Sequence, residues 1–377
     1  MRICLETLSC DRRTGIGRIV RALAHEFVAR GNDVHIVTHD PGVLDAAIHT
    51  HNVMGFPRSK ALSKILFRYG ERRHLRSLNA DVAYSFGVGR WADVVAAQSC
   101  HRAGMEILGT HSLALWEQRA WGLYDMISLS DEKALLTSKQ ERRIIACSNL
   151  VKDQLVHYYG VGPERIVVIP NGIEPRPSET PTETSTLLRE QLGLVSEEKV
   201  LLFMGNEFAR KGLHTVIEAM ARLAMPGLRL VVAGGGYRRP FERLAAALGI
   251  EDRVTFLGKV AEPEQLFGVA DLFVFPSLYE PFGMVVLEAM AAGVPVITSR
   301  ACGATEGMRH GLHGIFLDDP TSAGEVAEWV RTLLADDVLS RKISREGKII
   351  ASQFCWDAIA ERTLEVLEGA RAARQSL

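Results

Sequence analysis

Short, continuous apolar runs recur along the whole chain, and each is followed by a loop and a segment with helical periodicity. In the first half they occupy residues 2–6, 33–38, 81–86, 93–98, 143–148 and 165–170. In the second half they occupy residues 199–205, 228–234, 253–258, 271–276, 294–299 and 313–318. Continuous apolar runs, unlike alternating ones, indicate strands covered on both faces, as in parallel sheets. The rhythm predicts an α/β fold of two Rossmann-like, doubly wound parallel-sheet domains with a cleft between them.

A change of composition near the middle of the chain marks the boundary between these domains. Residues 170–186, PNGIEPRPSETPTETST, are rich in Pro, Ser, Thr and Glu and show no periodicity, which predicts a linker. We therefore expect one domain over residues 1–173 and a second over residues 174–356. Both are of ordinary domain size, as a chain of 377 residues leads one to expect.

The composition excludes several classes of protein. The formal net charge of −1 gives no global reason to expect nucleic-acid binding. The first twenty residues include Arg2, Glu6 and Asp11, so they do not read as a secretory signal, and no apolar run reaches the roughly twenty residues of a membrane span. The six cysteines lack the spacing of a zinc site, which favours reduced thiols in a cytoplasmic protein. We expect no metal and no cofactor.

The stretch PSLYEPFGMVVLEAM, residues 276–290, places two glutamates around the start of a predicted helix. The helix is expected to begin near Gly283, and the N–H groups around Phe282, Gly283, Met284 and Val285 would form an anion site suited to phosphate. Glu288 lies roughly 8 Å along the helix from Gly283 at ~1.5 Å per residue. Glu280 precedes the helix. Two carboxylate acceptors flanking a phosphate site suit the ribose and sugar hydroxyls of a nucleoside diphosphate sugar.

The stretch FMGNEFARKGLHT, residues 203–215, supplies the cations that such a ligand requires. A strand leads through Gly205 into a loop with Arg210 and Lys211, and a helix follows. Paired cations at a strand end suit the charges of a diphosphate and of a departing nucleotide. The stretch is not a P-loop, because Arg210 occupies the glycine position before the lysine and Gly212 the Ser/Thr position.

The first domain offers weaker signals. Gly15 and Gly17 in DRRTGIGRIV lie between the first strand and the first helix, where a backbone turn could approach a phosphate or a sugar. As a dinucleotide fingerprint the stretch fails, since Val20 stands at the position of the third glycine. His101 follows a strand end and could hold a sugar hydroxyl or a proton. An ordinary turn for the glycines and a structural role for His101 remain open alternatives.

These motifs in combination resemble the family-four retaining glycosyltransferases, which have the GT-B fold. The resemblance rests on the E-x7-E motif from Glu280 to Glu288, on GNEFARKG (205–212), on IPNGI (169–173) and on the Gly15–Gly17 loop. It runs over essentially the whole chain. Within the family the chain is most similar to bacterial glucosyltransferases that extend the lipopolysaccharide core, although EPFG stands where those enzymes have EAAG.

The resemblance implies a role for each of these residues. Arg210 and Lys211 would bind the diphosphate, Glu280 the donor sugar and Glu288 the ribose. The backbone near Val260 would recognise the base, and His101 would lie near the transferred sugar. The resemblance also implies that the helix over residues 357–377 packs on the first domain, and that the reaction retains the anomeric configuration without a metal ion.

Two further segments carry an open choice. Residues 57–78 are rich in Arg, Lys and His with a single glutamate, and Leu62, Ile65, Leu66 and Tyr69 recur at helical spacing. This segment could lie on an anionic membrane surface, bind a phosphorylated acceptor or be a solvated basic helix. Residues 111–126, with Trp116, Trp121 and Tyr124, are expected to pack in the core, with an interfacial patch as the alternative.

The sequence therefore predicts an enzyme that transfers a hexose, with glucose from UDP-glucose as first choice, to a saccharide or glycolipid acceptor. We expect it in the cytoplasm, with the inner face of the plasma membrane as a place where it could bind peripherally. A nucleotide-sugar epimerase or a phosphorylase of the same fold is the enzyme alternative. A regulatory nucleotide-sugar sensor is the alternative without catalysis. A nicotinamide dehydrogenase is disfavoured by Val20 in the failed fingerprint.

Overall fold

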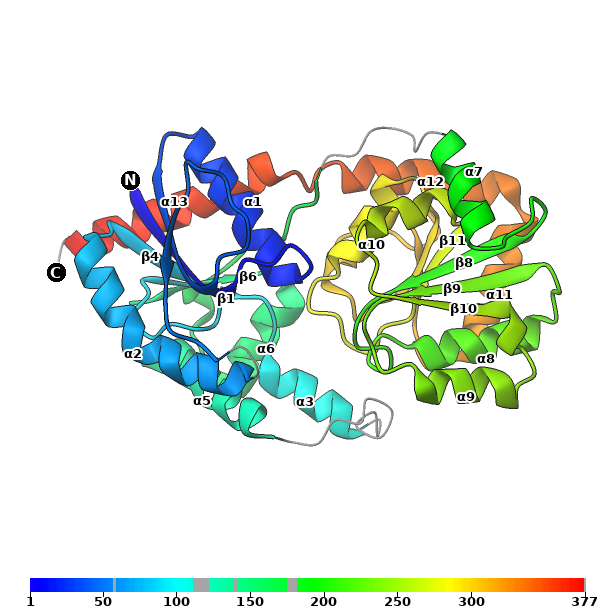
Figure 1. Cartoon of the computed structure of the whole chain (residues 1–377), viewed down its shortest axis with the longest axis horizontal. Coiled ribbons are helices and arrows are strands. Elements are labelled where there is room, and N and C mark those ends of the chain that lie inside the picture. Colours follow the sequence, from blue (N-terminus) through cyan, green and yellow to red (C-terminus); the bar gives the residue numbers. More distant parts are fainter. Residues whose placement is uncertain (57–58, 111–121, 139–140, 175–181, 376–377) are drawn as a thin grey trace. The chain divides into compact units, whose positions relative to one another are not determined.

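The computed structural model of the chain describes residues 1–56, 59–110, 122–138, 141–174 and 182–375, which form two compact units (Figure 1). Unit 1 consists of Met1–Met105, Ala120–Gly172 and Phe354–Leu377. Unit 2 consists of Glu106–Arg119 and Ile173–Gln353.

Unit 1 is built on a seven-stranded sheet in the order β3-β2-β1-β4-β5-β6-β7, and every neighbouring pair is parallel. Leu5 in β1 lies between Ile36 of β2 and Tyr84 of β4, and all three are buried because helices cover both faces. The strands are β1 (Arg2–Ser9), β2 (Asp33–Asp40), β3 (His49–Asn52), β4 (Val82–Ser85), β5 (Val94–Ala97), β6 (Arg143–Ala146) and β7 (Ile166–Val168).

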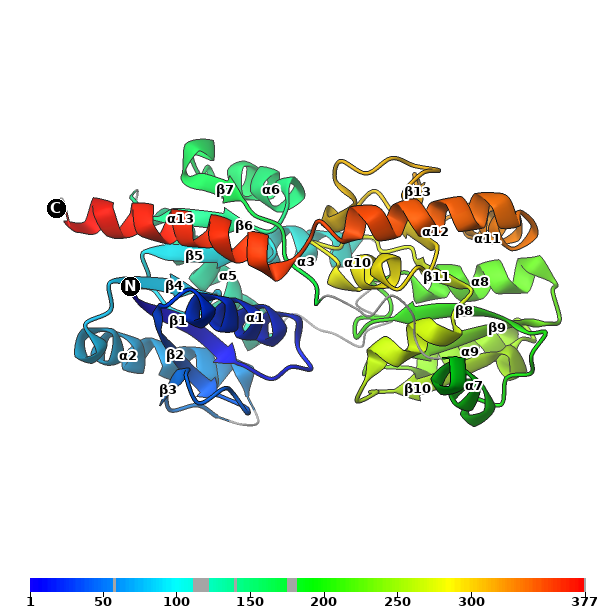
Figure 2. The same cartoon turned by 90° about the horizontal axis from the view of Figure 1, so that it is seen from above.

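The helices of unit 1 form a layer on each face of its sheet. One layer contains α1 and α13, which contact each other, and the other contains α2 and α5 (Figures 1 and 2). Serine side chains cap α2 and α6, where Ser59 and Ser148 accept a hydrogen bond from the first turn. The helices are α1 (Gly15–Ala29), α2 (Lys60–Leu78), α5 (Leu123–Thr137), α6 (Asn149–Tyr159) and α13 (Trp356–Gln375), together with the first part of α3 (His101–Thr110), which belongs to unit 1 up to Met105.

Unit 2 repeats the same strand order in a six-stranded parallel sheet, β10-β9-β8-β11-β12-β13. Its strands are β8 (Lys199–Met204), β9 (Leu228–Ala233), β10 (Val254–Gly258), β11 (Leu272–Phe275), β12 (Val296–Ser299) and β13 (Ile315–Leu317). Helices α8, α9 and α11 lie on one face, and α10 and α12 lie on the other (Figure 1). The helices are α7 (Thr182–Gln191), α8 (Leu213–Leu223), α9 (Arg239–Ala247), α10 (Met284–Ala291), α11 (Ala323–Ala335) and α12 (Asp337–Ala351).

Helix α13 belongs to unit 1, although all of unit 2 from Ile173 onwards precedes it in the chain. It buries Trp356, Ile359 and Leu367 against the unit and contacts α1, β4, β5 and β6. Polar contacts along its length accompany this packing, including Arg362 Nη2, which donates to the Val168 carbonyl at 2.8 Å. Unit 1 is therefore assembled from segments far apart in the sequence.

The structure differs from the sequence-based expectation at two elements. Strand β3 was not expected, because its sequence His-Thr-His-Asn contains no apolar residue, and it pairs only at the edge of the sheet. The expected linker is wrong in its last residues, because α7 begins at Thr182, where Thr and Glu start a helical turn. Residues 175–181 lie outside the described part of the chain.

None of the helices in the described part of the chain combines the length and the apolar composition that a membrane span needs. Trp116 and Trp121, for which the sequence leaves core packing and an interfacial patch open, lie outside the described residues, as do residues 57–58 of the basic segment.

Candidate active site

Three of the residues predicted for the second domain, Arg210, Lys211 and Glu280, meet at one place in unit 2. In its sheet β8 and β11 are neighbours although two α-helices, α8 and α9, and two strands, β9 and β10, separate them in the chain, so the order of the strands reverses between them. Ligands of doubly wound sheets bind beyond the carboxyl ends of the strands at such a point. Gly205 and Lys211 follow β8, and Glu280 and Gly283 follow β11. The topology therefore brings the two motifs together.

Two glycines allow the loop after β8 to fold closely. A Cβ at Gly205 would stand 2.4 Å from Cδ of Lys211, so the lysine side chain crosses directly over this residue. Gly212 has a φ of +79°, and a Cβ there would stand 2.0 Å from the carbonyl oxygen of Pro276. A side chain at Gly212 would therefore require a backbone shift, whereas one at Gly205 would displace the Lys211 side chain. The Lys211 ammonium lies 4.8 Å from the ring centroid of Phe275.

Lys211 and Glu280 form the ion pair at the centre of this site. Lys211 Nζ donates to Glu280 Oε2 at 2.9 Å, and Arg210 Nη1 lies 3.7 Å from the same oxygen. The side chains of Lys211 and Glu280 are 14% and 12% exposed, so the pair is shielded from water but can still be reached from outside. A polar or anionic ligand could replace either partner with little loss of hydrogen bonding.

Arg210 is held more tightly than the sequence suggested. Its Nε and Nη2 donate to Glu207 Oε2 at 3.1 and 2.6 Å, and Nη1 donates to the Tyr279 carbonyl. Burial by itself would lower the pKa of Arg210, but Glu280 and Glu207 outweigh it and raise that pKa. The guanidinium therefore ties the loop after β8 to the loop after β11, and Lys211 is the more accessible cation.

The start of α10 has the geometry of an anion site. Its N-cap, Gly283, has a φ of +97°, and no side chain of the described residues caps the helix there. Phe282 is buried at 4% exposure, whereas Met284 and Val285 in the first turn are half-buried. The N–H groups of the first turn and the helix dipole favour a negative charge at this end.

Glu288 lies on the buried side of α10, where it is 5% exposed. A buried carboxylate requires polar partners, so its presence in an otherwise apolar helix is unusual for a purely structural residue. The structure places Glu280 before the helix and Glu288 within it, as the motif predicts.

His101 is the first residue of α3, four residues after the end of β5. Its Nε2 lies 3.2 Å from Oδ1 of Asp125 on α5, and its backbone N–H donates to Glu132 Oε1 at 2.7 Å. Asp125 is almost fully buried and so fixes the imidazole. The Asp125 partner was missed in the sequence, since 24 residues separate the two.

Gly15 and Gly17 lie in the first turn of α1, and the expectation of a loop at these glycines is wrong. Thr14 is the N-cap and its Oγ1 accepts the Gly17 N–H at 3.1 Å, so this N–H group is already used. A Cβ at Gly17 would stand 2.2 Å from the Asp11 carbonyl oxygen, which explains the glycine by close packing.

One part of the site was missed in the sequence analysis. Gly234, Gly235 and Gly236 follow β9 and press against the residues after β8; a Cβ at Gly234 would stand 1.6 Å from the Gly205 carbonyl oxygen. The Gly235 N–H donates to Asn206 Oδ1 at 2.8 Å. Three consecutive glycines directly after an apolar strand were the available signal. Val260, expected near the base, is half-buried two residues after β10.

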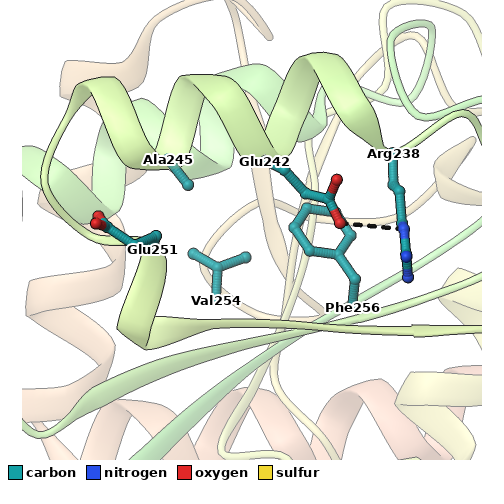
Figure 3. Close-up of a pocket in the computed structure, with 6 residues that line it drawn as sticks. All are labelled: Arg238, Glu242, Ala245, Glu251, Val254 and Phe256. Carbon is teal, nitrogen blue, oxygen red and sulfur yellow. Dashed lines mark ion pairs between the residues drawn. The ribbon is translucent and has the colours of Figure 1, made fainter.

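A pocket of ≈ 260 Å³ lies elsewhere in unit 2, between α9 and the edge strand β10 (Figure 3). Its lining comprises Arg238, Glu242, Ala245, Glu251, Val254 and Phe256. Arg238 Nε and Glu242 Oε1 form an ion pair of 3.1 Å at this pocket (Figure 3). None of these residues belongs to the site at β8 and β11. Among the described residues no group of three or more His, Cys, Asp or Glu side chains could hold a metal ion.

Comparison with protein families matches both halves of the chain. The model described as Glycosyl transferases group 1 matches residues 184–349, and the model described as Glycosyltransferase Family 4 matches residues 13–176. The chain belongs to these glycosyltransferases. The family models thus cover the loops that carry Gly205, Arg210, Lys211, Glu280 and Glu288.

Individual relatives match parts of this glycosyltransferase. An uncharacterized glycosyltransferase of Methanocaldococcus jannaschii is 33% identical over 260 residues, which are 66% of this chain and 65% of the relative. The lipopolysaccharide glucosyltransferase WaaG of Escherichia coli is 30% identical over 218 residues, 56% of this chain and 58% of WaaG. The matches therefore span between about half and two thirds of the length of the curated relatives.

Solved structures establish that the glycosyltransferase has the GT-B fold. The crystal structure of WaaG, a glycosyltransferase involved in lipopolysaccharide biosynthesis, superposes with a TM-score of 0.82 at 24% identity, covering 97% of this chain and all of WaaG. Anabaena HepE in complex with UDP-glucose superposes with a TM-score of 0.75 at 21% identity, covering 98% of this chain and all of HepE.

Proposed function

We propose that this glycosyltransferase moves a hexose from a nucleoside diphosphate sugar to a saccharide or glycolipid acceptor and retains the anomeric configuration. The observation that carries the proposal is the Lys211–Glu280 ion pair between the switch-point loops and the uncapped start of α10. The group 1 and family 4 matches support the reaction class, and the solved HepE complexes with UDP and with UDP-glucose favour a uridine nucleotide as donor.

The charges of the site suit a diphosphate that departs in the reaction. The first turn of α10 and the Lys211 ammonium would share the negative charge that develops on the leaving nucleotide. Once the diphosphate binds Lys211, Glu280 is released to accept hydrogen bonds from sugar hydroxyls. Arg210 fixes the position of the loop after β8 relative to the loop after β11 through its hydrogen bonds to Glu207 and Tyr279. Glu288, buried in α10, is the acceptor proposed for the ribose.

The proton of the acceptor needs a base close to the reacting carbon. In a retaining reaction on one face of the sugar, the departing phosphate oxygen takes that proton, and the bond to the acceptor oxygen forms as the bond to the phosphate breaks. Unit 2 then only needs to stabilise charge and orient the donor. His101, oriented by Asp125, is proposed to bind a sugar hydroxyl.

A donor panel tests the proposal directly. UDP-, GDP- and ADP-sugars are incubated with the protein, with and without EDTA, and nucleotide release and transfer are measured. We expect turnover of a UDP-sugar that EDTA does not change, a loss of about 100-fold or more in Glu280→Gln, and unchanged nucleotide binding. Glu242→Gln removes a carboxylate of the same unit at the α9 pocket and serves as the matched control.

The same panel separates the alternatives. An epimerase would change the sugar of the donor without transferring it, and a sensor would bind one donor without consuming it. NMR of the product shows the anomeric configuration, and an inverted product contradicts the retaining mechanism.

We also infer that unit 1 binds an anionic membrane surface where a glycolipid acceptor would be found. On α2 and α5, which contact each other, the apolar residues Leu62, Tyr69 and Met126 are exposed, and Tyr69 is 82% exposed. Exposed Arg73 and Arg76 lie on the same helix as Tyr69. Apolar side chains that insert beside cations that bind lipid phosphates are the pattern of a peripheral membrane site.

Sedimentation with vesicles tests this inference. We expect binding to vesicles that contain phosphatidylglycerol and little binding to pure phosphatidylcholine. Arg73→Glu/Arg76→Glu should lower the binding about 30-fold, because two cations at roughly 1 kcal/mol each are lost. Arg238→Glu/Arg239→Glu changes two exposed arginines of unit 2 and should leave binding unaffected. Equal losses in both double variants would point to net charge alone.

A further inference from the structure

The loop that carries Glu280 is held from one side by the segment after β12. Three backbone hydrogen bonds join them: Glu280 N–H to the Ala301 carbonyl at 2.9 Å, Gly303 N–H to the Glu280 carbonyl at 2.9 Å, and Ala304 N–H to the Phe282 carbonyl at 2.7 Å. Glu280 and Cys302 thereby form a parallel bridge outside the regular strands. The Glu280 backbone is fixed on both its N–H and its C=O.

The thiol of Cys302 adds a fourth contact from within this segment. Its Sγ donates to the Phe282 carbonyl oxygen at 3.0 Å, the same carbonyl that accepts from Ala304. Cys302 is 1% exposed. Its own carbonyl accepts from Thr305 Oγ1 at 2.8 Å, so the residue is held in turn by the short helical turn Gly303–Thr305.

The sulfur also fills the space beneath the N-cap of α10. A Cβ at Gly283 would stand 2.7 Å from Sγ and 3.0 Å from Cγ of Glu280, so the three residues are packed together without room to spare. Burial, and after it the charge of Glu280, raises the pKa of the Cys302 thiol far above its ordinary value. The thiol thus keeps its proton at neutral pH and remains a donor.

We propose that Cys302 is a positioning residue of the active site, which holds the Phe282 carbonyl and the underside of Gly283 so that the Glu280 carboxylate faces Lys211. The inference rests on the proposed function. A side chain without the donor would leave the Phe282 carbonyl with one partner fewer and open a gap beneath Gly283, which allows the loop to shift. A shift of less than 1 Å in a group that meets the transition state is costly for the rate.

Three variants test this role. Cys302→Ala removes donor and volume, Cys302→Ser keeps a donor in a smaller side chain, and Thr298→Val is the matched control. Thr298 is fully buried in β12 of the same unit, and its Oγ1 donates to the Phe275 carbonyl at 2.8 Å, a contact of the same kind outside the loop. Thermal unfolding of all three gives the structural cost of losing such a bond.

With the UDP-sugar that the wild type turns over, we expect Cys302→Ala to lower kcat about tenfold with KM for the donor changed less than about twofold. Cys302→Ser should recover most of the rate, to within about threefold of the wild type, because it again donates to Phe282. Thr298→Val should keep the wild-type kcat even if its midpoint of unfolding falls as far as that of Cys302→Ala.

The outcomes separate the inference from the function on which it rests. A wild type that turns over a donor while Cys302→Ala is equally active contradicts the inference alone, as does a loss of kcat in Thr298→Val of the same size. A wild type that binds UDP-glucose more tightly than UDP but does not turn it over contradicts the proposed transferase activity. In that case the role of Cys302 is tested by affinity: Cys302→Ala should no longer bind UDP-glucose more tightly than UDP, and an unchanged preference contradicts the inference. A wild type that binds neither contradicts both.

Discussion

Units 1 and 2 share one strand order but place their charged residues differently. Among the described residues of unit 2, the buried charged side chains are Glu198, which pairs with Arg229, and the two candidate site residues Glu280 and Glu288. In unit 1 they lie within the body of the unit and comprise Glu6, Lys64, Glu71, Asp125, Asp131 and Arg142. Burying a charge costs free energy unless it is paired, so the buried charged side chains of unit 1 need partners within the unit.

This network joins α2, α5 and the loop after β4. Asp131 on α5 pairs with Arg68 of α2 and with Arg90, and Lys64 Nζ donates to Ser128 Oγ at 3.1 Å. Arg142 donates to the backbone carbonyls of Ala92 and Arg90 at 3.0 and 2.6 Å. Unit 2 therefore has two of its three buried charged side chains among the described residues at the candidate site, whereas unit 1 uses its buried charges to hold helices and loops together.

The largest effect is expected where unit 2 concentrates its charge. Lys211→Ala should lower kcat/KM for the donor about 100-fold or more, because it removes the accessible cation and leaves Glu280 without its 2.9 Å partner. Lys199→Ala, at the opposite end of β8, removes the 2.8 Å ion pair with Asp271 and should leave kcat/KM unchanged. Similar losses of kcat/KM in the two variants would show that the overall charge of unit 2 affects the activity, and not the ion pair at the site.

The close contact between Gly234 and the Gly205 carbonyl tests how tightly the backbone is packed around that site. Gly234→Ala should lower the free energy of unfolding by about 3 kcal/mol, because φ is +137° and the new Cβ would meet the Gly205 carbonyl. Gly227→Ala in the same unit meets nothing within 4 Å and should change it by less than about 0.5 kcal/mol. Urea denaturation followed by circular dichroism measures both; equal stabilities would refute the close contact.

The buried carboxyl pair of unit 1 should make its stability depend on pH. Burial, and then the neighbouring Glu71, raises the pKa of Glu6 well above its ordinary value, while Glu71 accepts the N–H groups of Arg90 and Trp91 at 2.8 and 2.7 Å. The folded state then binds a proton that the unfolded state releases, so stability falls as pH rises above the ordinary carboxyl pKa towards the raised one.

Glu6→Gln keeps the shape and removes this ionisation. We expect the variant to be more stable than the wild type at pH 8 by about 1–2 kcal/mol, and the difference to shrink towards pH 5. Denaturation across this pH range measures it. Glu26→Gln, on the surface of α1, is the comparison variant. A wild type whose stability is level from pH 5 to 8 would show that Glu6 does not hold the proton.

The smallest effect of pH on stability is expected at the edge strand β3, where stability falls as the pH is lowered, opposite to the effect of Glu6. His35 Nδ1 and His51 Nε2 lie 2.8 Å apart, His35 Nε2 lies 3.0 Å from Asp33, and His49 and His74 stand around them. Burial, and then the other histidines, lowers the pKa of His51. His51 therefore contributes its full stabilisation at a pH above the ordinary histidine pKa. This stabilisation is lost as the pH falls from the ordinary pKa towards the lowered pKa of His51 in the folded protein.

Hydrogen exchange at β3 measures this loss. Between pH 7.5 and 5.5, after correction for intrinsic rates, we expect protection of the β3 amides to fall about threefold, because burial and the neighbouring histidines disfavour the charge that His51 gains. His51→Gln should show a smaller change, whereas His157→Gln on α6 should behave like the wild type. An increase of protection at low pH would overturn the assignment.

The contrast between the units also explains what the sequence could and could not predict. Twelve apolar runs correspond to strands, because a buried strand must be apolar whatever its neighbours are. Strand β3 has no apolar residue and exists only because β2 offers an edge. The start of α10 and the loop with Lys211 were predictable because each is formed by residues that are consecutive in the sequence. Asp125 beside His101, Glu71 beside Glu6 and Cys302 beside Phe282 depend on tertiary packing, which no local pattern contains.

The position of α13 has a consequence for how this protein is made. Since unit 1 needs a helix that is translated after all of unit 2, the ribosome releases the complete sequence of unit 2 while unit 1 still lacks the cover over β4, β5 and β6. Domains generally fold as they emerge, so unit 2 can complete its fold before unit 1 can. In the interval the apolar face meant for Trp356, Ile359 and Leu367 is open, and it is during synthesis that a chaperone would have most to protect.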